Sequence, residues 1–196
     1  MCSSDLFDFP AGRSDRSAFF RDELEQMLVL SHGEKRDPAA LKGSYAGAFG
    51  LPQFMPSSFV KYAIDFDADG RIDLLASAAD AIGSVAHYLA EFGWKRGMPT
   101  RYAVAAPVDS SQRARLLVPD ILPTFTAAQL AEHGAVLAPE GRGHDGLLAL
   151  VELQNGDAAP SYVAGTANFY AVTRYNWSSY YALAVIELGE AVARQR

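Results

Sequence analysis

The residues with the clearest chemistry in this 196-residue chain lie between positions 43 and 56. They begin with a glycine-rich stretch, Gly43-Ser-Tyr-Ala-Gly-Ala-Phe-Gly50, and continue as Leu-Pro-Gln53-Phe-Met-Pro56. Three glycines in eight positions suit a backbone that approaches another group closely, because glycine adopts conformations that other residues avoid. The side-chain amide of Gln53 can both donate and accept hydrogen bonds, which suits a ligand rich in hydroxyl and acetamido groups. This stretch therefore predicts a carbohydrate-binding loop.

Acidic residues alternate along positions 65–73 in the order of the first half of an EF-hand calcium loop. Carboxylates so close in sequence repel one another unless a hard cation lies among them. The twelfth position, where an EF-hand has a bidentate glutamate, is Ala76, so two oxygen ligands are missing and we expect weak affinity. The expected calcium ligands are Asp65, Asp67, Asp69, Arg71 through its carbonyl oxygen, and Asp73. The alternative is an acidic turn that is merely solvated.

An aromatic and amide cluster precedes the last apolar segment of the chain. Tyr175 and Asn176 are followed, about one helical turn later, by Tyr180 and Tyr181. Aromatic faces stack on the apolar faces of sugar rings, and an asparagine amide can bind an N-acetyl group. The alternative, taken from these residues alone, is a set of ordinary half-buried tyrosines.

Composition excludes several classes of function. The chain is 49% hydrophobic and 20% charged, which is typical of a globular protein with one sizeable core. A net charge of −6 argues against a nucleic-acid partner. The four histidines show no metal-ligand spacing, and the single Cys2 cannot form an internal disulfide. There is no nucleophile elbow, phosphate-binding loop or dinucleotide fingerprint.

The pattern of apolar residues and caps predicts a mainly α fold with a small α+β insertion. Helical spacing and capping residues favour helices over 18–30, 56–63, 81–92 and 178–193, with a short helix after Asp37. Between residues 97 and 165 the texture changes to short β-like runs at 102–105 and 147–153, with a brief helix over 126–132. Ser77 and Asp80 are interpreted as a capping box of the 81–92 helix.

Several segments occur in the order found in one enzyme family: 43–74, Asp80–Tyr88, Glu91–Trp94 and Asn168–Asn176. From about Phe7 onward the chain resembles the lytic murein transglycosylase B family, periplasmic enzymes that cut the glycan strands of bacterial peptidoglycan. The resemblance implies a lysozyme-like helical domain over 7–96 and 166–196, with 97–165 as the inserted α+β subdomain. It also implies cleavage of the MurNAc-GlcNAc β-1,4 bond with formation of a 1,6-anhydro-MurNAc end.

The same resemblance implies site residues, a metal and partners. Substrate-binding residues of the family match Ser44, Gln53 and Tyr88 on one wall of a glycan groove, and Tyr175, Asn176 and Tyr181 on the other. A calcium site of the type described above is implied, and no organic cofactor. The implied partner is the peptidoglycan glycan strand, in the periplasm or cell envelope, with outer-membrane association through an N-terminus absent from this sequence.

The catalytic residue of that family is a single glutamic acid, and we assign none of this chain's residues to the role. The family's glutamic acid lies upstream of the segment that matches Phe7, so we expect it before residue 1. The early carboxylates Glu23 and Glu25 lie next to Arg21 on a charged helix face, which is usually solvated, and Glu34 follows that helix. We therefore expect a fragment that binds glycan but does not cleave it.

Two further interpretations stay open. The chain is alternatively a noncatalytic peptidoglycan-binding module with a calcium loop, or a calcium-binding structural protein in which Gln53 and Asn176 have no ligand role. Residues 1–6 have neither the basic start nor the apolar core of a signal peptide, and they match the translated end of a sequencing adapter. We interpret them as a non-native tail; a short native tail is the alternative.

Overall fold

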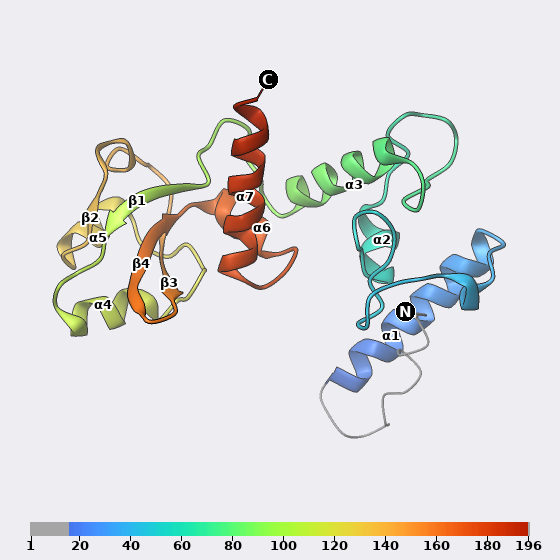
Figure 1. The fold of residues 1–196 in the computed structure, drawn as a ribbon, viewed down its shortest axis with the longest axis horizontal. Helices are drawn as coiled ribbons and strands as arrows, with labels where there is room; N and C mark the ends of the chain where they lie inside the picture. Colours follow the sequence, from blue (N-terminus) through green and yellow to red (C-terminus); the bar gives the residue numbers. More distant parts are fainter. Residues whose placement is uncertain (1–15, 196) are drawn as a thin grey trace. The chain divides into compact units, whose positions relative to one another are not determined.

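The computed structural model describes residues 16–195 (Figure 1). Its contacts divide the chain into two compact units, one up to Tyr88 and one from Leu89. The helices are α1 (Arg16–Gly33), α2 (Pro56–Tyr62), α3 (Ala78–Glu91), α4 (Ser110–Leu117), α5 (Ala127–Glu132), α6 (Ala167–Thr173) and α7 (Ser179–Ala193), with 3₁₀ turns η2 (Pro38–Ala40) and η3 (Pro139–Gly141). The strands are β1 (Arg101–Ala105), β2 (Val136–Leu137), β3 (Ala149–Asn155) and β4 (Ala158–Gly165). Within residues 16–195, no helix is long and apolar enough to cross a membrane.

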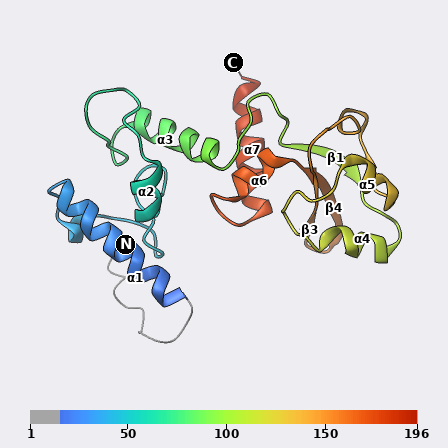
Figure 2. The ribbon, with the colours of Figure 1, turned by 180° about the vertical axis from the view of Figure 1, so that it is seen from behind.

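The first unit is built on contact between α1 and α2 (Figure 2). Phe20 and Met27 of α1 are buried together with Leu41, which follows η2. Helix α2 begins at Pro56, but its N-cap residue, Met55, has no side-chain oxygen to cap the first turn. Glu23 of α1 supplies that cap from outside the helix, since its carboxylate accepts hydrogen bonds from Ser57 N at 2.9 Å and Ser57 Oγ at 2.6 Å.

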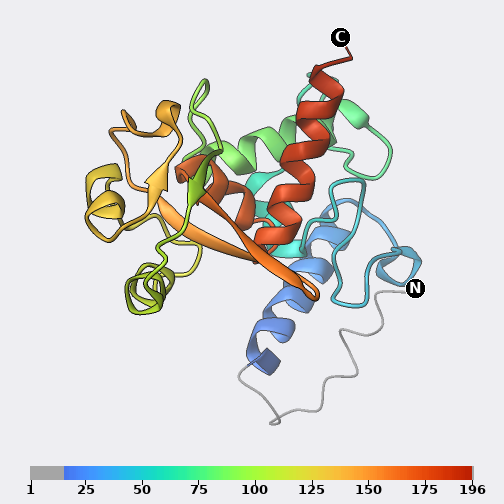
Figure 3. The same cartoon turned by 60° about the vertical axis from the view of Figure 1, so that its left-hand side comes forward.

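The second unit contains a four-stranded antiparallel sheet of order β2-β1-β4-β3. Strands β3 and β4 form a hairpin in which Leu150 pairs with Ala164 and Val151 with Val163. Successive side chains of a strand point to opposite faces of the sheet, so β3 contributes residues to two separate hydrophobic clusters. Leu150 packs in a core cluster that includes residues of α4 and α5, and Val151 in one that includes residues of α6 and α7. Figure 3 shows α7 beside the β3–β4 hairpin.

The observed elements confirm the mainly α fold with a small β part. The helices expected around 18–30, 56–63, 81–92, 126–132 and 178–193 are all present. Helices α4 and α6 were not predicted from the sequence; they begin at the side-chain caps Asp109 and Thr166. The division into a lysozyme-like domain with an insertion at 97–165 stays a prediction. The proposed tail at residues 1–6 lies outside the described residues.

Candidate functional site

The glycine-rich loop is closed on itself by short backbone pairings. Phe49 pairs with both Gly43 and Phe54 in isolated antiparallel bridges. At the tip, Ser44 N donates to Ala48 O at 2.7 Å, and Ser44 Oγ accepts from Ala48 N at 3.1 Å. The hydroxyl of Ser44 is thereby fixed as an acceptor towards the loop. Its proton is left for another acceptor, such as a ligand oxygen.

Gln53 has a conformation that only its surroundings can hold in place. Its φ is +53°, a left-handed value that is unfavourable for a residue with a side chain. Its backbone N and its side-chain Nε2 both donate to Gly50 O, at 3.1 and 2.9 Å. The amide is thus oriented before any ligand arrives, at an exposed position of the loop. Its Oε1 is placed to accept a hydrogen bond from a hydroxyl or acetamido N–H group.

The turn that orients Gln53 rests on the acidic loop. Leu51 N donates to Leu74 O at 2.7 Å, and a Cβ at Gly50 would lie 2.8 Å from the same oxygen. The φ of Gly50 is +76°, so glycine is needed here for both its conformation and its lack of a side chain. The two segments singled out in the sequence therefore meet in the structure.

Tyr88 lies within the first unit's core. It is only 7% exposed, and its ring lies 4.8 Å from that of Tyr62 and 5.7 Å from that of Phe54. Phe54 directly follows Gln53, so the contact between the Tyr88 and Phe54 rings supports the loop. A direct contact of Tyr88 with substrate stays a prediction.

The second set of expected ligand residues lies at the turn between α6 and α7. The rings of Tyr175 and Tyr181 are stacked, with centroids 6.4 Å apart and planes 15° apart. Asn176 is exposed, and its backbone carbonyl oxygen accepts a hydrogen bond from the backbone N of Ser178, the N-cap residue of α7. Tyr180 is occupied differently, because its hydroxyl bonds the backbone of Gln154 in β3. Ser44, Gln53 and Tyr88 lie in the first unit and this set in the second, so a common groove stays a prediction.

Three carboxylates of the first unit come together as a candidate metal centre. One oxygen from each of Asp65, Asp67 and Asp80 lies within 4.8 Å of the others. Asp80 is 1% exposed, yet Asp73 N and Phe66 N donate to its two oxygens at 2.8 and 2.9 Å. These hydrogen bonds, that of Asp73 first, hold the pKa of Asp80 below its usual value. The group is therefore anionic at neutral pH, and its oxygen donors suit a hard divalent cation such as Ca²⁺.

Asp80 was missed as a ligand candidate because it fitted a helix cap. Ser77 Oγ does accept from Asp80 N at 3.1 Å, as a cap requires. The side chain of Asp80, however, turns to the acidic loop. The sequence held one signal for this, a carboxylate flanked by alanines and an isoleucine. The structure places that carboxylate on the buried side of α3.

The other expected calcium ligands lie outside that group of three. The carboxylate of Asp69 accepts from Arg71 N at 2.9 Å, with the Arg71 guanidinium 3.7 Å from its second oxygen. Asp73 Oδ1 accepts from Leu75 N and Ala76 N. These side chains shape the turns of the loop in the described structure. Their role as ligands stays a prediction.

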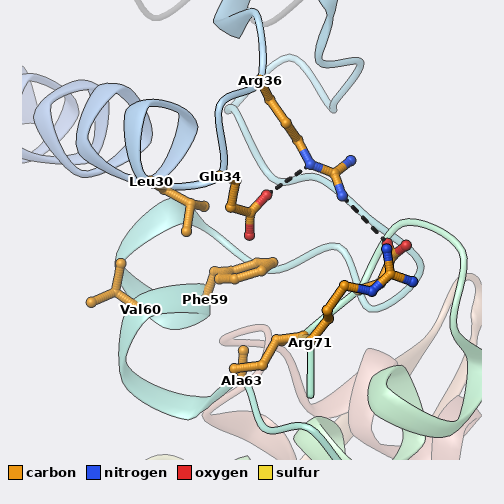
Figure 4. A pocket seen from close by; sticks show the side chains of 9 residues that line it. Leu30, Glu34, Arg36, Phe59, Val60, Ala63 and Arg71 are labelled. Atoms are coloured by element: carbon orange, nitrogen blue, oxygen red, sulfur yellow. Dashed lines mark ion pairs between the residues drawn. The ribbon is translucent and has the colours of Figure 1, made fainter. Parts of the chain in front are cut away.

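A cavity of about 560 Å³ opens between α1, α2 and the acidic loop, within the first unit (Figure 4). Its apolar wall includes Leu30 and Phe59. On the polar side, Arg36 Nε lies 2.8 Å from Glu34 Oε2, and Arg36 NH2 lies 3.9 Å from Asp73 Oδ1. Figure 4 shows both ion pairs. Glu34 is thus engaged by Arg36, and the end of α1 is tied to the acidic loop.

The expectation that Glu23 lies on a solvated face is wrong. Glu23 is only 3% exposed, and both of its oxygens accept from Ser57, as described for the start of α2. Its partner is 34 residues away in sequence, which helix periodicity cannot reveal. Both carboxylate oxygens are engaged by Ser57, so we assign Glu23 the role of a structural cap. Glu25 is exposed, as expected.

Comparison with known proteins gives one consistent result. A family profile described as "Transglycosylase SLT domain" matches residues 6–190. The chain is 41% identical over 191 residues to the membrane-bound lytic murein transglycosylase B of Escherichia coli (strain K12), covering 97% of this chain and 49% of that protein. The chain thus spans about half the length of this curated relative.

Solved structures agree with that similarity. The soluble lytic transglycosylase SltB1 from Pseudomonas aeruginosa superposes with a TM-score of 0.83 at 39% identity, covering 99% of this chain and 62% of that one. The Escherichia coli lytic transglycosylase Slt35, solved in complex with calcium, also gives 0.83, at 38% identity over 98% of this chain and 59% of that one. Slt35 has also been solved in complex with bulgecin A.

Proposed function

We propose that this chain, which belongs to the transglycosylase SLT domain family, is the glycan-binding part of a peptidoglycan lytic transglycosylase. The reaction is cleavage of the β-1,4 bond between MurNAc and GlcNAc, in which the C6 hydroxyl of MurNAc attacks and a 1,6-anhydro sugar forms. The single observation that carries the proposal for this chain is the pre-oriented amide of Gln53. The backbone of Gln53 has a left-handed φ, and its backbone N and side-chain Nε2 both donate hydrogen bonds to Gly50 O.

Pre-orientation matters because a polysaccharide offers many weak contacts and few strong ones. A side chain that is already fixed loses little conformational entropy on binding, so more of each hydrogen bond contributes to affinity. Gln53 Oε1 accepts from a sugar N–H or O–H group, and Ser44 Oγ donates to a sugar oxygen. Both groups lie on the same closed loop, which suits recognition of one acetamido sugar.

The turn between α6 and α7 supplies a different type of contact. Stacked Tyr175 and Tyr181 offer flat apolar surface to the C–H face of a pyranose ring, and Asn176 offers a further amide. We propose that this set binds the same glycan strand as Gln53. Peptidoglycan is a cell-envelope polymer, so we place the protein in the periplasm or cell envelope.

None of the described carboxylates is assigned the role of general acid. Glu23 caps α2, Glu34 is paired with Arg36, and Glu25 is an exposed charge. A positioned proton donor contributes roughly 10²- to 10⁴-fold in rate. We therefore propose that residues 16–195 bind the glycan without cleaving it.

Purified peptidoglycan tests both parts of this proposal. The 196-residue chain should sediment with insoluble peptidoglycan, and the supernatant should contain no 1,6-anhydromuropeptides by chromatography and mass spectrometry. Gln53→Ala should weaken binding by roughly 3- to 10-fold, the value of about one net hydrogen bond. Gln154→Ala, at another exposed glutamine, is the matched control and should bind normally. Anhydro products from the chain alone would show that one of its own carboxylates acts as the acid.

We also propose that the acidic loop binds Ca²⁺ through Asp65, Asp67 and Asp80. Support comes from the closeness of the three carboxylates, the ionised state of Asp80 and the calcium complex of Slt35. The cation would neutralise the repulsion among these charges and so stabilise the loop. Leu74, which directly follows this loop, accepts a hydrogen bond from Leu51 N in the turn before Gln53, so the cation would also have a structural role for the glycan site.

A further inference from the structure

Trp177 is an exposed tryptophan in the turn that carries Asn176. It lies between α6 and α7, and it is 60% exposed. A single exposed apolar side chain is common on protein surfaces, so the surroundings of Trp177 decide what it can do. Its neighbours in sequence are Asn176, a proposed ligand residue, and Ser178, the cap of α7.

The indole ring is fixed despite its exposure. The guanidinium of Arg174 lies 4.8 Å from the centroid of the Trp177 ring. The same guanidinium lies 5.7 Å from the ring of Tyr170 and 5.5 Å from that of Phe92. Tyr170 also meets Trp177 edge to face, with centroids 6.4 Å apart and planes 83° apart. Arg174 is therefore the centre of a small aromatic cluster that holds the indole in place.

This arrangement leaves much of the indole accessible to a ligand. Arg174 and Tyr170 contact the ring, yet Trp177 is still 60% exposed. The indole is then a rigid, flat, apolar surface beside an exposed amide, which is the combination that binds one face of a sugar ring.

We propose that Trp177, positioned by Arg174, is a further sugar-stacking residue that extends the contacts of Tyr175 and Asn176 along the glycan. The inference rests on the proposed function and deepens it, because it names one more residue that sets affinity for acetamido sugars. The competing role is structural: the Arg174 cluster would only lock the turn between α6 and α7. The two roles differ in whether a ligand covers the indole.

The chain contains two tryptophans, so fluorescence can separate them. The variant Trp94→Phe leaves Trp177 as the only tryptophan. Titration with chitotetraose, the N-acetylglucosamine tetramer, should shift the emission of this variant to shorter wavelength and reduce acrylamide quenching. Both changes should saturate at the concentration found by calorimetry. The matched variant Trp177→Phe keeps only Trp94, which is 37% exposed, and its emission should stay constant.

Affinity and stability measurements address the structural role. Trp177→Ala should weaken chitotetraose binding by about 3- to 10-fold, and Trp177→Phe, which keeps a smaller ring, by less. Arg174→Lys removes the planar support, so it should raise acrylamide quenching of Trp177 in the free protein and weaken binding. A lower melting temperature of Trp177→Ala with unchanged affinity would overturn the proposal and indicate a purely structural role in the turn between α6 and α7.

The outcomes also separate this inference from the proposed function. Calorimetric binding without any change in Trp177 emission would overturn the stacking role and leave glycan binding intact. If calorimetry shows no heat for chitotetraose or for solubilised glycan strands, and the emission stays constant, both proposals fail. Binding with a saturable change confined to the Trp94→Phe variant supports both.

Discussion

Gly50 gives the sharpest test of how the glycine-rich loop is supported. In Gly50→Ala, the added Cβ would lie 2.8 Å from Leu74 O, the oxygen that accepts from Leu51 N. The left-handed φ of +76° alone costs an L-residue about 1–2 kcal/mol. The contact with a backbone oxygen cannot be relieved by a side-chain rotation, so either Leu74 or the turn must move. We expect a total loss of about 2–4 kcal/mol.

Gly97→Ala is the matched control, because Gly97 has a φ of +83° and a Cβ added there would meet no other group within 4 Å. It should show the conformational cost alone. For a chain of this size, about 1 kcal/mol corresponds to roughly 2–4 °C in melting temperature. We expect a clearly larger fall for Gly50→Ala by differential scanning fluorimetry, together with weaker chitotetraose binding, since Gly50 O orients Gln53. Equal falls for the two variants, or unchanged binding, would refute this role of Gly50.

Three further predictions concern buried carboxylates. Millimolar calcium should raise the melting temperature, and Asp80→Asn should abolish that rise; a rise that persists in the variant would remove Asp80 from the site. Glu23→Ala should cost about 1–3 kcal/mol in urea unfolding, because it leaves Ser57 N at the start of α2 without a partner, whereas Glu25→Ala should be neutral; equal effects would contradict the cap. Because the folded-state pKa of Asp80 is lowered, its contribution to stability is present above the unfolded-state value of about 4 and is lost as the pH falls through the folded value. The difference in melting temperature between wild type and Asp80→Asn should therefore shrink in acid; a constant difference would rule out this linkage.

Local sequence signals predicted the elements that depend on nearby residues. The helix expected over 126–132 begins with a capping box, in which Thr126 Oγ1 accepts from Gln129 N and the Gln129 side chain accepts from Thr126 N. Ser178 caps α7 with a single hydrogen bond, since its Oγ accepts from Tyr181 N. Such caps join residues three apart, so their partners can be read from the sequence.

Features that depend on distant partners could not be predicted in this way. The carboxylates of Glu23 and Asp80 resembled a surface charge and a helix cap. Their hydrogen-bond partners lie 34 residues away for Glu23, and 7 and 14 residues away for Asp80. Helix α4 was missed because its sequence is polar and only Leu116 of its residues is buried. Its position is fixed by the sheet against which it packs, which periodicity alone does not show.

In the candidate site, too, residue identities could be predicted from the sequence, whereas contacts with distant residues could not. Gln53 was expected in a ligand loop from its residue type and Ser44 from the family resemblance, and the structure places both on one closed loop. The orientation of the Gln53 amide depends on Gly50 O, and that of the turn on Leu74, neither of which the sequence indicates. Trp177 drew no attention as a residue type, because its exposure and its contact with Arg174 exist only in the folded chain.

Binding of the peptidoglycan glycan through residues of both units is the proposal on which the others depend. Chemical-shift mapping with ¹⁵N-labelled protein and chitotetraose is the decisive experiment, because side-chain amides report on their own contacts. We predict saturable shifts at the side-chain amides of Gln53 and Asn176, with one common dissociation constant. Shifts at only one of these two amides, or at neither while the protein remains folded, would contradict binding through both units.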